Sequence, residues 1–209
     1  MLVYAQDDPR IALGAQPELD RDAALQFART LFPSDKLELL GETDLWSTCP
    51  PRNEIHVGQF PRIAVVAAKE FGIDHPSRLP RQFLEAIPAR NIYLHAMHSV
   101  VDRFAYAHWV DARLVRSLSV SPDSGVLEDI GARLPFEEPY WSGQHPVIVD
   151  ERSREAYPLP FHPLDLGDAA MFALFGYRLE GFTEPAQVTP ESIRLLRLGR
   201  SGTRWKFWR

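Results

Sequence analysis

Apolar residues divide the chain into short runs with strand or helix character. Residues 2–5 form a short apolar run that predicts a first strand. Across residues 19–31 the apolar positions recur at every fourth residue, a spacing that predicts an amphipathic helix, and Pro33 ends it. Residues 37–40 predict a second strand. The chain therefore opens with a strand, a helix and a strand.

The next section alternates between irregular and buried character. Residues 42–54 contain a tryptophan, a cysteine and two prolines, and they predict a loop. Residues 55–60 and 63–68 predict two strands, and the second is nearly all apolar, as expected of a strand that is buried on both faces. Residues 77–87 then predict a short helix, which Pro88 ends.

Three runs rich in aromatic and branched residues follow one another at residues 91–99, 103–110 and 113–120. Because only short polar segments separate them, they predict an antiparallel meander. The sequence SPDSG at 121–125 predicts a type I turn closed by a left-handed glycine, which leads into a fourth strand at 126–130.

The remaining pattern completes the fold prediction. Residues 150–155 predict a solvated excursion, and residues 165–175 predict a last helix with Asp165 as N-cap and Gly176 as its terminating glycine. We therefore expect an α+β fold, a mostly antiparallel sheet of six or more strands. Two to three helices, near 19–31, 78–87 and 165–175, should pack against one face. The prediction is one globular domain over 1–199, followed by a basic aromatic tail at 200–209.

One arginine of the meander needs a partner. A two-residue turn at Asp111 and Ala112 would pair four positions of the neighbouring strands: Val110 with Arg113, Trp109 with Leu114, Ala107 with Arg116, and Ala105 with Leu118. This register places Arg116 on an apolar face. Removing one partner of a buried ion pair costs about 3 to 5 kcal/mol, so Arg116 should meet a carboxylate. We expect either Glu137 or Glu138 to pair with it and the other to be solvated.

The segment LPFEEPYWSGQHP at 134–146 allows two interpretations. As a corner, it packs Phe136 and two other aromatic residues on the core, and Gly143 permits a sharp bend. As a cleft, it belongs to a small hydrolase or transferase, with candidate catalytic residues Glu137, Glu138, Arg116, His98 and His145. The adjacency of the two glutamates opposes a paired acid and base, because neighbours on an extended chain point to opposite sides. The candidate binding residues are Trp141, Tyr140 and Trp109.

Other chemistry receives less support from the spacing. His95, His98 and His108 lie on neighbouring strands, but the first two are three residues apart and would face opposite sides. Ser99 lies outside any G-x-S-x-G motif, and residues 99–102 predict the turn between two strands. Nothing near Cys49 in the sequence would lower the pKa of its thiol. A glycine-rich phosphate loop is missing as well. We therefore expect neither a bound metal nor a cofactor.

Composition narrows the class of protein. With 209 residues and 45% apolar residues, the chain can bury one core. Its sequence has no apolar run of 18 residues, so we expect no insertion into a membrane, and the apolar stretch before Asp7 is too short for a secretory signal. The single cysteine cannot form an internal disulfide. These features favour a cytoplasmic protein.

Charge is distributed unevenly. The formal net charge is -5, yet all 28 acidic residues precede Arg194, while the sequence from Arg194 onward adds only basic charges. An acidic body repels phosphate backbones, so the charge distribution disfavours nucleic-acid binding except through the tail. The terminal RWKFWR could dock its aromatic rings on the body, or bind single strands or an anionic membrane surface.

Several long strings carry a resemblance. RLVRSLSVSPDSGVLEDIGARLPFEEPYWSG, FHPLDLGDAAMFALFGYRLEG, FPRIAVVAAKEFGIDHPSRLP and the opening MLVYA resemble an uncharacterised family of bacterial proteins, found mainly in actinobacteria and classed as a domain of unknown function. The resemblance runs from Met1 to about Gly181. It implies a single cytosolic domain and brings no activity, cofactor or catalytic residue. Relatives favour Asp-Gly where this chain has Asp111 and Ala112, and Asp-Gly suits the type I′ turn that sets the predicted strand register better than Asp-Ala does.

The leading functional hypothesis is a non-catalytic binding or protein-interaction domain, whose partner could be another protein. It is favoured because a structural role explains each candidate set of acid, base, nucleophile or metal ligands better than a catalytic or metal-binding role does. The two alternatives are the small hydrolase or transferase at 134–146, and contact with an anionic polymer or membrane surface through the tail.

Overall fold

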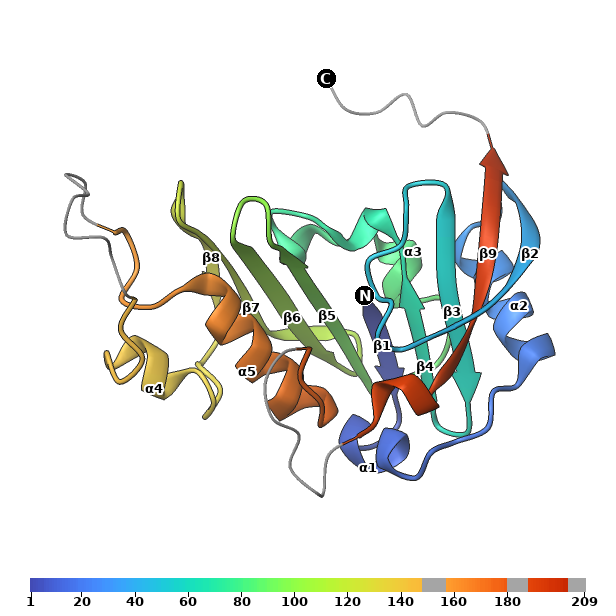
Figure 1. Cartoon of the computed structure of the whole chain (residues 1–209), viewed down its shortest axis with the longest axis horizontal. Coiled ribbons are helices and arrows are strands. Elements are labelled where there is room, and N and C mark those ends of the chain that lie inside the picture. Colours follow the sequence, from blue (N-terminus) through green and yellow to red (C-terminus); the bar gives the residue numbers. More distant parts are fainter. Residues whose placement is uncertain (148–156, 180–187, 203–209) are drawn as a thin grey trace.

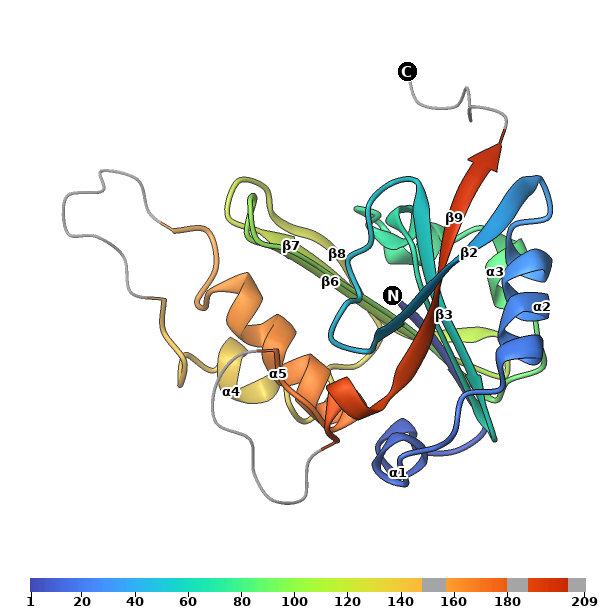
Figure 2. The same ribbon diagram turned by 45° about the vertical axis from the view of Figure 1, so that its right-hand side comes forward.

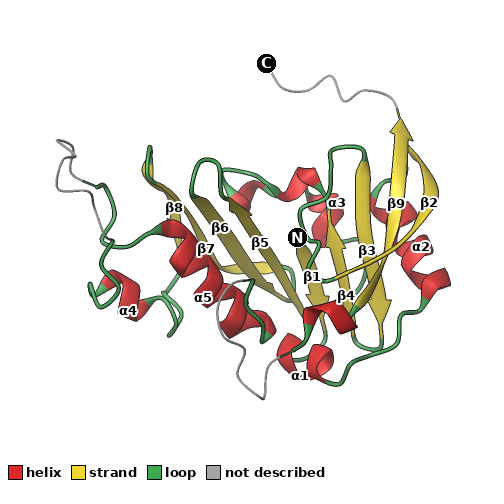
Figure 3. Cartoon of the chain, viewed as in Figure 1, coloured by secondary structure: helices red, strands yellow, loops and turns green. Residues whose placement is uncertain are grey.

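One open antiparallel sheet organises the molecule (Figures 1 and 3). The computed structural model describes residues 1–147, 157–179 and 188–202. Its nine strands lie in the order β2-β9-β3-β4-β1-β5-β6-β7-β8, and every neighbouring pair is antiparallel. The strands are β1 Leu2–Ala5, β2 Asp35–Asp44, β3 Glu54–Phe60, β4 Ile63–Ala67, β5 Asn91–His98, β6 Arg103–Val110, β7 Arg113–Ser121, β8 Gly125–Ile130 and β9 Arg194–Gly202.

Short helices connect and cover the strands. The α-helices are α1 Pro9–Gly14, α2 Arg21–Leu31, α3 Arg81–Leu84, α4 Glu138–Trp141 and α5 Pro163–Phe175, and the 3-10 helices are η1 Lys69–Phe71, η2 Pro76–Arg78 and η3 Pro190–Ser192. This arrangement confirms the predicted α+β class. Within the described ranges, no helix has both the length and the apolar character needed to cross a membrane.

Both faces of the central strands are buried. In β1, Leu2 and Tyr4 point into a core shared with α2 and α3, while Val3 and Ala5 point into a second core shared with α1 and α5. Alternate side chains of a strand face opposite sides, so an all-apolar strand needs cover on both. The expectation that all helices pack against one face is therefore wrong, and Figure 2 shows α2 and α5 on opposite sides of the sheet.

Most predicted elements are confirmed with small changes at their ends. The helix α2 begins after Asp20, whose carboxylate accepts a hydrogen bond from the amide of Ala23 at 2.9 Å. The meander corresponds to β5, β6 and β7. The fourth predicted strand corresponds to β8, and Gly125 before it has a φ of +65°. Gly176 ends α5 in the left-handed conformation, with a φ of +80°.

Three boundaries are wrong. The helix expected over residues 77–87 consists of two short pieces, η2 and α3, because Pro80 is the extended N-cap residue of α3. At α5 the N-cap position belongs to His162, and Asp165 lies in the first turn. The loop expected from residue 42 begins later, because β2 continues to Asp44 through its pairing with β9.

The strand β9 had no counterpart in the predicted elements. It lies between β2 and β3 in the sheet, and it includes Arg200, which we had placed in the tail. The Nε atom of Arg200 lies 3.0 Å from Asp35, and a second ion pair joins Arg200 to Glu70. The rest of the tail and the excursion predicted at 150–155 lie outside the described residues.

The β6–β7 turn forms as predicted, but the register beyond it does not. Asp111 and Ala112 have φ values of 48° and 59°, so the type I′ turn forms with alanine in the left-handed region. Val110 pairs with Arg113 and Trp109 with Leu114 as predicted, whereas His108 then pairs with Arg116.

The cause of the shift is a β-bulge, in which Val115 is the extra residue of β7. The predicted pairs Ala107–Arg116 and Ala105–Leu118 are therefore wrong: Ala107 pairs with Ser117 and Ala105 with Ser119. A shift of one residue moves side chains to the other face of a sheet. Arg116 therefore lies on the face opposite to Trp109, on the side of Leu118 and α5.

A glycine beside the bulge makes the geometry possible. Gly131 has a φ of +84°, and a Cβ atom added there would lie 2.1 Å from the carbonyl oxygen of Val115. A side chain at this position would therefore meet both backbone strain and a collision with the bulged strand.

We predict that Gly131→Ala lowers the free energy of unfolding by more than about 2 kcal/mol, through left-handed strain and the clash together. Urea denaturation measures the loss. The matched control is Gly143→Ala, because Gly143 has a φ of +78° but no atom within 4 Å of an added Cβ. The control should lose only about 1 kcal/mol. Equal losses in the two variants would contradict a clash at the bulge.

Candidate functional site

The candidate catalytic residues Arg116 and Glu137 form a buried ion pair. Both side chains have an exposed fraction of 0%. The guanidinium donates from Nε to Oε1 of Glu137 at 2.9 Å and from Nη2 to Oε2 at 2.6 Å. This confirms that one glutamate pairs with Arg116, while Glu138 is exposed at the start of α4. Arg116 also donates to Asp129 at 2.5 Å and to the carbonyl oxygen of Ile130 at 2.9 Å.

Glu137 receives further donors. The hydroxyl of Tyr106 donates to Oε1 at 2.5 Å, and the amide of Leu134 donates to the same oxygen at 2.7 Å. Burial by itself lowers the pKa of Arg116, but the hydrogen bonds from Arg116 to Glu137 and Asp129 outweigh it and raise that pKa above its ordinary value. Burial, together with the charge of Glu137, raises the pKa of Tyr106. The site therefore keeps Arg116 charged and Tyr106 neutral.

The candidate binding residues serve packing in this structure. Tyr140 donates to the carbonyl oxygen of Asp165 at 3.1 Å. Trp141 packs edge-on against Phe161 at 4.9 Å between ring centroids. Trp109 has an exposed fraction of 2% and belongs to the core on the α2 side of the sheet, whereas Tyr140 and Trp141 pack into the core on the α5 side. The three residues thus form no common surface.

The remaining catalytic candidates lie apart from the ion pair. His145 is exposed and stacks on Tyr140, with ring centroids 4.4 Å apart, and His98 is exposed at the end of β5. Since Arg116 has no exposed side-chain surface, it cannot contact a substrate together with either histidine in this conformation. The arrangement supports the corner interpretation. The catalytic interpretation of these residues stays a prediction.

Two of the three histidines considered for metal binding, His95 and His108, have protein partners instead. His95 is 3% exposed, and its Nε2 lies 2.9 Å from the carbonyl oxygen of Gly167. The Nε2 of His108 lies 3.0 Å from Oδ1 of Asn91, and its ring stacks on Tyr93. Over the described part of the chain, no three histidine, cysteine or acidic side chains converge as metal ligands would.

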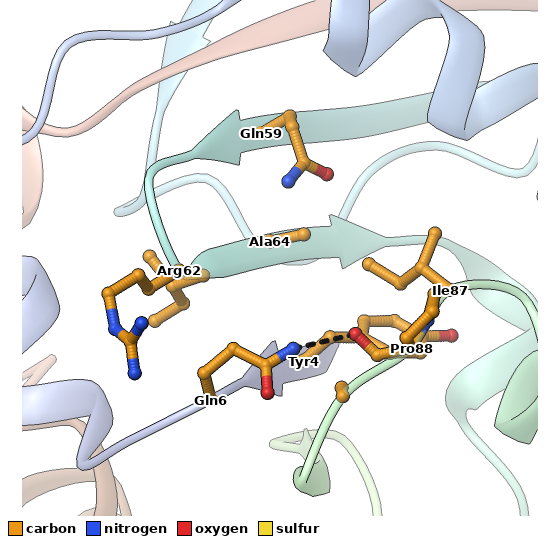
Figure 4. A pocket seen from close by; sticks show the side chains of 9 residues that line it. Tyr4, Gln6, Gln59, Arg62, Ala64, Ile87 and Pro88 are labelled. Atoms are coloured by element: carbon orange, nitrogen blue, oxygen red, sulfur yellow. Dashed lines mark hydrogen bonds between the residues drawn. The ribbon is translucent and has the colours of Figure 1, made fainter.

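A small cavity of about 280 Å³ lies between the first strands and the segment before β5 (Figure 4). The polar side chains that line it are those of Tyr4, Gln6, Gln59 and Arg62, and all of them except Gln59 have partners. The hydroxyl of Tyr4 donates to the carbonyl oxygen of Phe83 at 2.6 Å, Gln6 donates to that of Pro88 at 2.8 Å, and Arg62 pairs with Asp7. Because these groups are satisfied within the protein, this cavity offers little for a polar ligand to recognise.

A larger cavity of about 540 Å³ lies on the side of the sheet covered by α2 and α3. Its lining comes from the end of α2, the start of β2, the segments η1 and η2, and α3. Leu31, Phe32 and Phe83 are buried and form an apolar floor. Charged or titratable residues line its rim: Asp35, Lys69, Glu70, Asp74, His75, Arg78 and Arg103. We call this space the α2–α3 cavity.

Two arginines pair with the three carboxylates of the α2–α3 cavity. Arg200 pairs with Asp35 and Glu70, and its guanidinium lies 5.1 Å from the ring centroid of Phe32. Arg103 pairs with Asp74 and donates to the carbonyl oxygen of Gly72 at 3.0 Å, while burial lowers the pKa of Arg103. These contacts hold the rim in place around the apolar floor.

On the rim, the Nδ1 atom of His75 lies 3.8 Å from Oε2 of Glu128. Burial alone would raise the pKa of Glu128, but hydrogen bonds from Ser117 and Ser77 lower it below its usual value. Glu128 is therefore held as a carboxylate by groups of η2 and β7.

No pattern in the sequence predicts the α2–α3 cavity. Its lining residues are spread over segments 31–35, 69–83 and 103, and no motif links them. The one available signal was the proline-rich stretch HPSRLP at 75–80, which interrupts the helix that we had expected there. The cavity is produced by the way that these segments meet.

We predict that Arg116→Met costs about 3 to 5 kcal/mol of unfolding free energy, because it leaves Glu137 buried without its cation. In a Glu137→Gln background the same change should cost about 1 to 3 kcal/mol less. Chemical denaturation of the four proteins in this double-mutant cycle measures the coupling. The matched control is Glu138→Gln, since Glu138 is exposed and should show no coupling. Equal costs in the wild-type and Glu137→Gln backgrounds would rule the pairing out.

A second prediction concerns pH. Burial lowers the pKa of both His95 and His108 to about 4. In the unfolded chain a histidine titrates near 6.5, so the unfolded state binds protons that the folded state does not as pH falls from about 6.5 to 4. The contribution of these two histidines to the free energy of unfolding should therefore be fully present above pH 6.5 and should decrease as the pH falls from about 6.5 to 4. His95→Gln should remove up to about 3 kcal/mol of this decrease.

Thermal or urea unfolding between pH 7 and 4.5 measures the slope. His98→Gln is the control, because His98 is exposed and should leave the slope unchanged. An identical slope in wild type and His95→Gln would disprove the contribution of the buried imidazole.

Comparison with known proteins places the chain in a family. No curated protein and no solved structure matches it. The model of a family of unknown function, DUF6928, matches residues 1–198, which is nearly the whole chain and includes β1 to β8 and the first half of β9. The protein therefore belongs to this family of unknown function, DUF6928.

Proposed function

We propose that the protein is a non-catalytic binding protein and that a small molecule binds in the α2–α3 cavity. The observation that carries this proposal is the combination of size and lining. A volume of about 540 Å³ falls within the range of about 300 to 1,000 Å³ that is typical of small-molecule sites. A buried apolar floor under a charged rim is also the usual composition of such sites.

A binding role is favoured over a catalytic one by the state of the acidic groups. Each carboxylate that lines the cavity pairs with an arginine: Asp74 with Arg103, and Asp35 and Glu70 with Arg200. A carboxylate that is held by a guanidinium group is already engaged within the protein and is less free to act on a ligand. These groups position arginines and shape the rim.

We also infer that the protein acts as a single domain in the bacterial cytoplasm. The resemblance of its long sequence strings to actinobacterial proteins supports the bacterial origin. The lone Cys49 is unpaired and exposed, which suits a reducing compartment.

We predict that Gln82→Trp weakens the binding of cavity ligands at least tenfold. Gln82 lines the cavity from α3, so an indole there occupies part of the volume. Binders are first found by ligand-observed NMR with a general fragment library against the full chain, and their affinities are then compared between variants. The matched control is Arg81→Trp on the same helix, since Arg81 does not line the cavity and is exposed beside Glu85.

Several outcomes would contradict this proposal. An empty screen, or binders whose affinities are equal in wild type and Gln82→Trp, would reject the cavity as the binding site. Stable capture of another protein that Gln82→Trp does not weaken would instead support the predicted protein-interaction role.

A further inference from the structure

The rim of the α2–α3 cavity carries two cations without acidic partners. Among the described residues, neither Lys69 nor Arg78 lies within ion-pair distance of a carboxylate, although both line the cavity and both are exposed. The Nζ atom of Lys69 lies 3.9 Å from the thiol sulfur of Cys49. The other two arginines of this region, Arg103 and Arg200, are already neutralised by carboxylates.

The acids beside these cations are all engaged elsewhere. Asp74 pairs with Arg103, and Asp35 and Glu70 pair with Arg200. Glu128, on the far side of η2, accepts hydrogen bonds from both the amide and the hydroxyl of Ser77. Four cations of this region, Lys69, Arg78, Arg103 and Arg200, stand against the three carboxylates Asp35, Glu70 and Asp74, which leaves a local excess of one positive charge in a chain whose net charge is -5.

The floor is suited to a ring or a short aliphatic chain. Phe32 and Phe83 lie 5.8 Å apart between ring centroids, and Phe83 also packs edge-on against Phe71 at 5.2 Å. These contacts hold the rings in place, so an apolar group can enter without first ordering the floor. Burial of apolar surface against such a floor contributes to affinity in proportion to its area.

From these two features we infer that the α2–α3 cavity binds a small organic anion, whose carboxylate or phosphate group meets Lys69 and Arg78 while its apolar body lies on Phe32 and Phe83. The inference rests on the proposed function and adds the chemical class of the ligand. Cations at the rim remain partly hydrated, so the apolar body supplies much of the affinity and the charge supplies selectivity.

A matched set of four compounds tests this class: 3-phenylpropionate, 2-phenylethyl phosphate, 3-phenylpropionamide and 3-phenylpropylamine. All four share a phenyl body and differ mainly in the charge of the head group. Titrations of the full chain followed by NMR give the four affinities. At least one anion should bind about fivefold or more tightly than the neutral amide, the amine should bind least, and added NaCl should weaken only the anions. The ratio between the two anions separates a carboxylate from a phosphate preference.

Two variants locate the charge. Lys69→Gln and Arg78→Gln should each weaken anion binding by about threefold to fivefold and leave the amide unchanged. Both side chains are exposed, so folding should be unaffected, and the melting temperature of each variant checks this. Arg81→Gln is the control, because this exposed arginine does not line the cavity.

The possible failures are distinct. If the amide binds as tightly as the anions, or if anion binding survives the combined Lys69→Gln and Arg78→Gln change, the anion class is rejected. If none of the four compounds binds while Gln82→Trp weakens the binding of other fragments, the anion class also fails but the cavity remains a binding site. If no compound of any kind binds, the proposed function itself is overturned.

Discussion

The structure of the β7–β8 half of the sheet depends on the buried ion pair between Arg116 and Glu137. Taking two charges out of water is costly, and the pair is tolerable only when its remaining hydrogen-bonding groups are satisfied. Here Asp129, Tyr106 and the amide of Leu134 complete the set. The pair thereby joins the middle of β7 to the turn before α4. The proline-rich corner at 134–146 is held against the sheet by the same contacts, with its aromatic side chains packed near α5.

The bulge at Val115 determines where this ion pair can form. Without the extra residue, Arg116 would point to the same side as Trp109, into the core beneath α2. With it, the guanidinium lies on the α5 side, where Glu137 can reach it. Gly131 permits the bulge, since any larger residue would collide with the carbonyl group of Val115. A local change in backbone register thus separates the two faces of the sheet into different roles: a closed polar cluster on one and an open cavity on the other.

This separation bears on function. The corner is dense in residue types that carry out catalysis, yet its central pair is enclosed and each charge is neutralised. The α2–α3 cavity is lined by segments without a catalytic motif, but it combines space, an apolar floor of packed rings and two cations, Lys69 and Arg78, that have no carboxylate partner among the described residues. Open volume beside unsatisfied charge is a better indication of ligand binding than a high density of reactive residue types.

The sequence alone determined the type of most elements, because periodicity, proline and glycine act locally: the apolar run of β1, the four-residue spacing of α2, and the glycine after α5 all predicted what formed. It also predicted that Arg116 would need a carboxylate, since the cost of an unpaired buried charge applies to any fold. Only the tertiary structure decided the identity of that partner, the insertion of β9 between β2 and β3, and the α2–α3 cavity. Each of these depends on contacts between segments far apart in the chain, and on a bulge whose single extra residue reverses the faces of a strand.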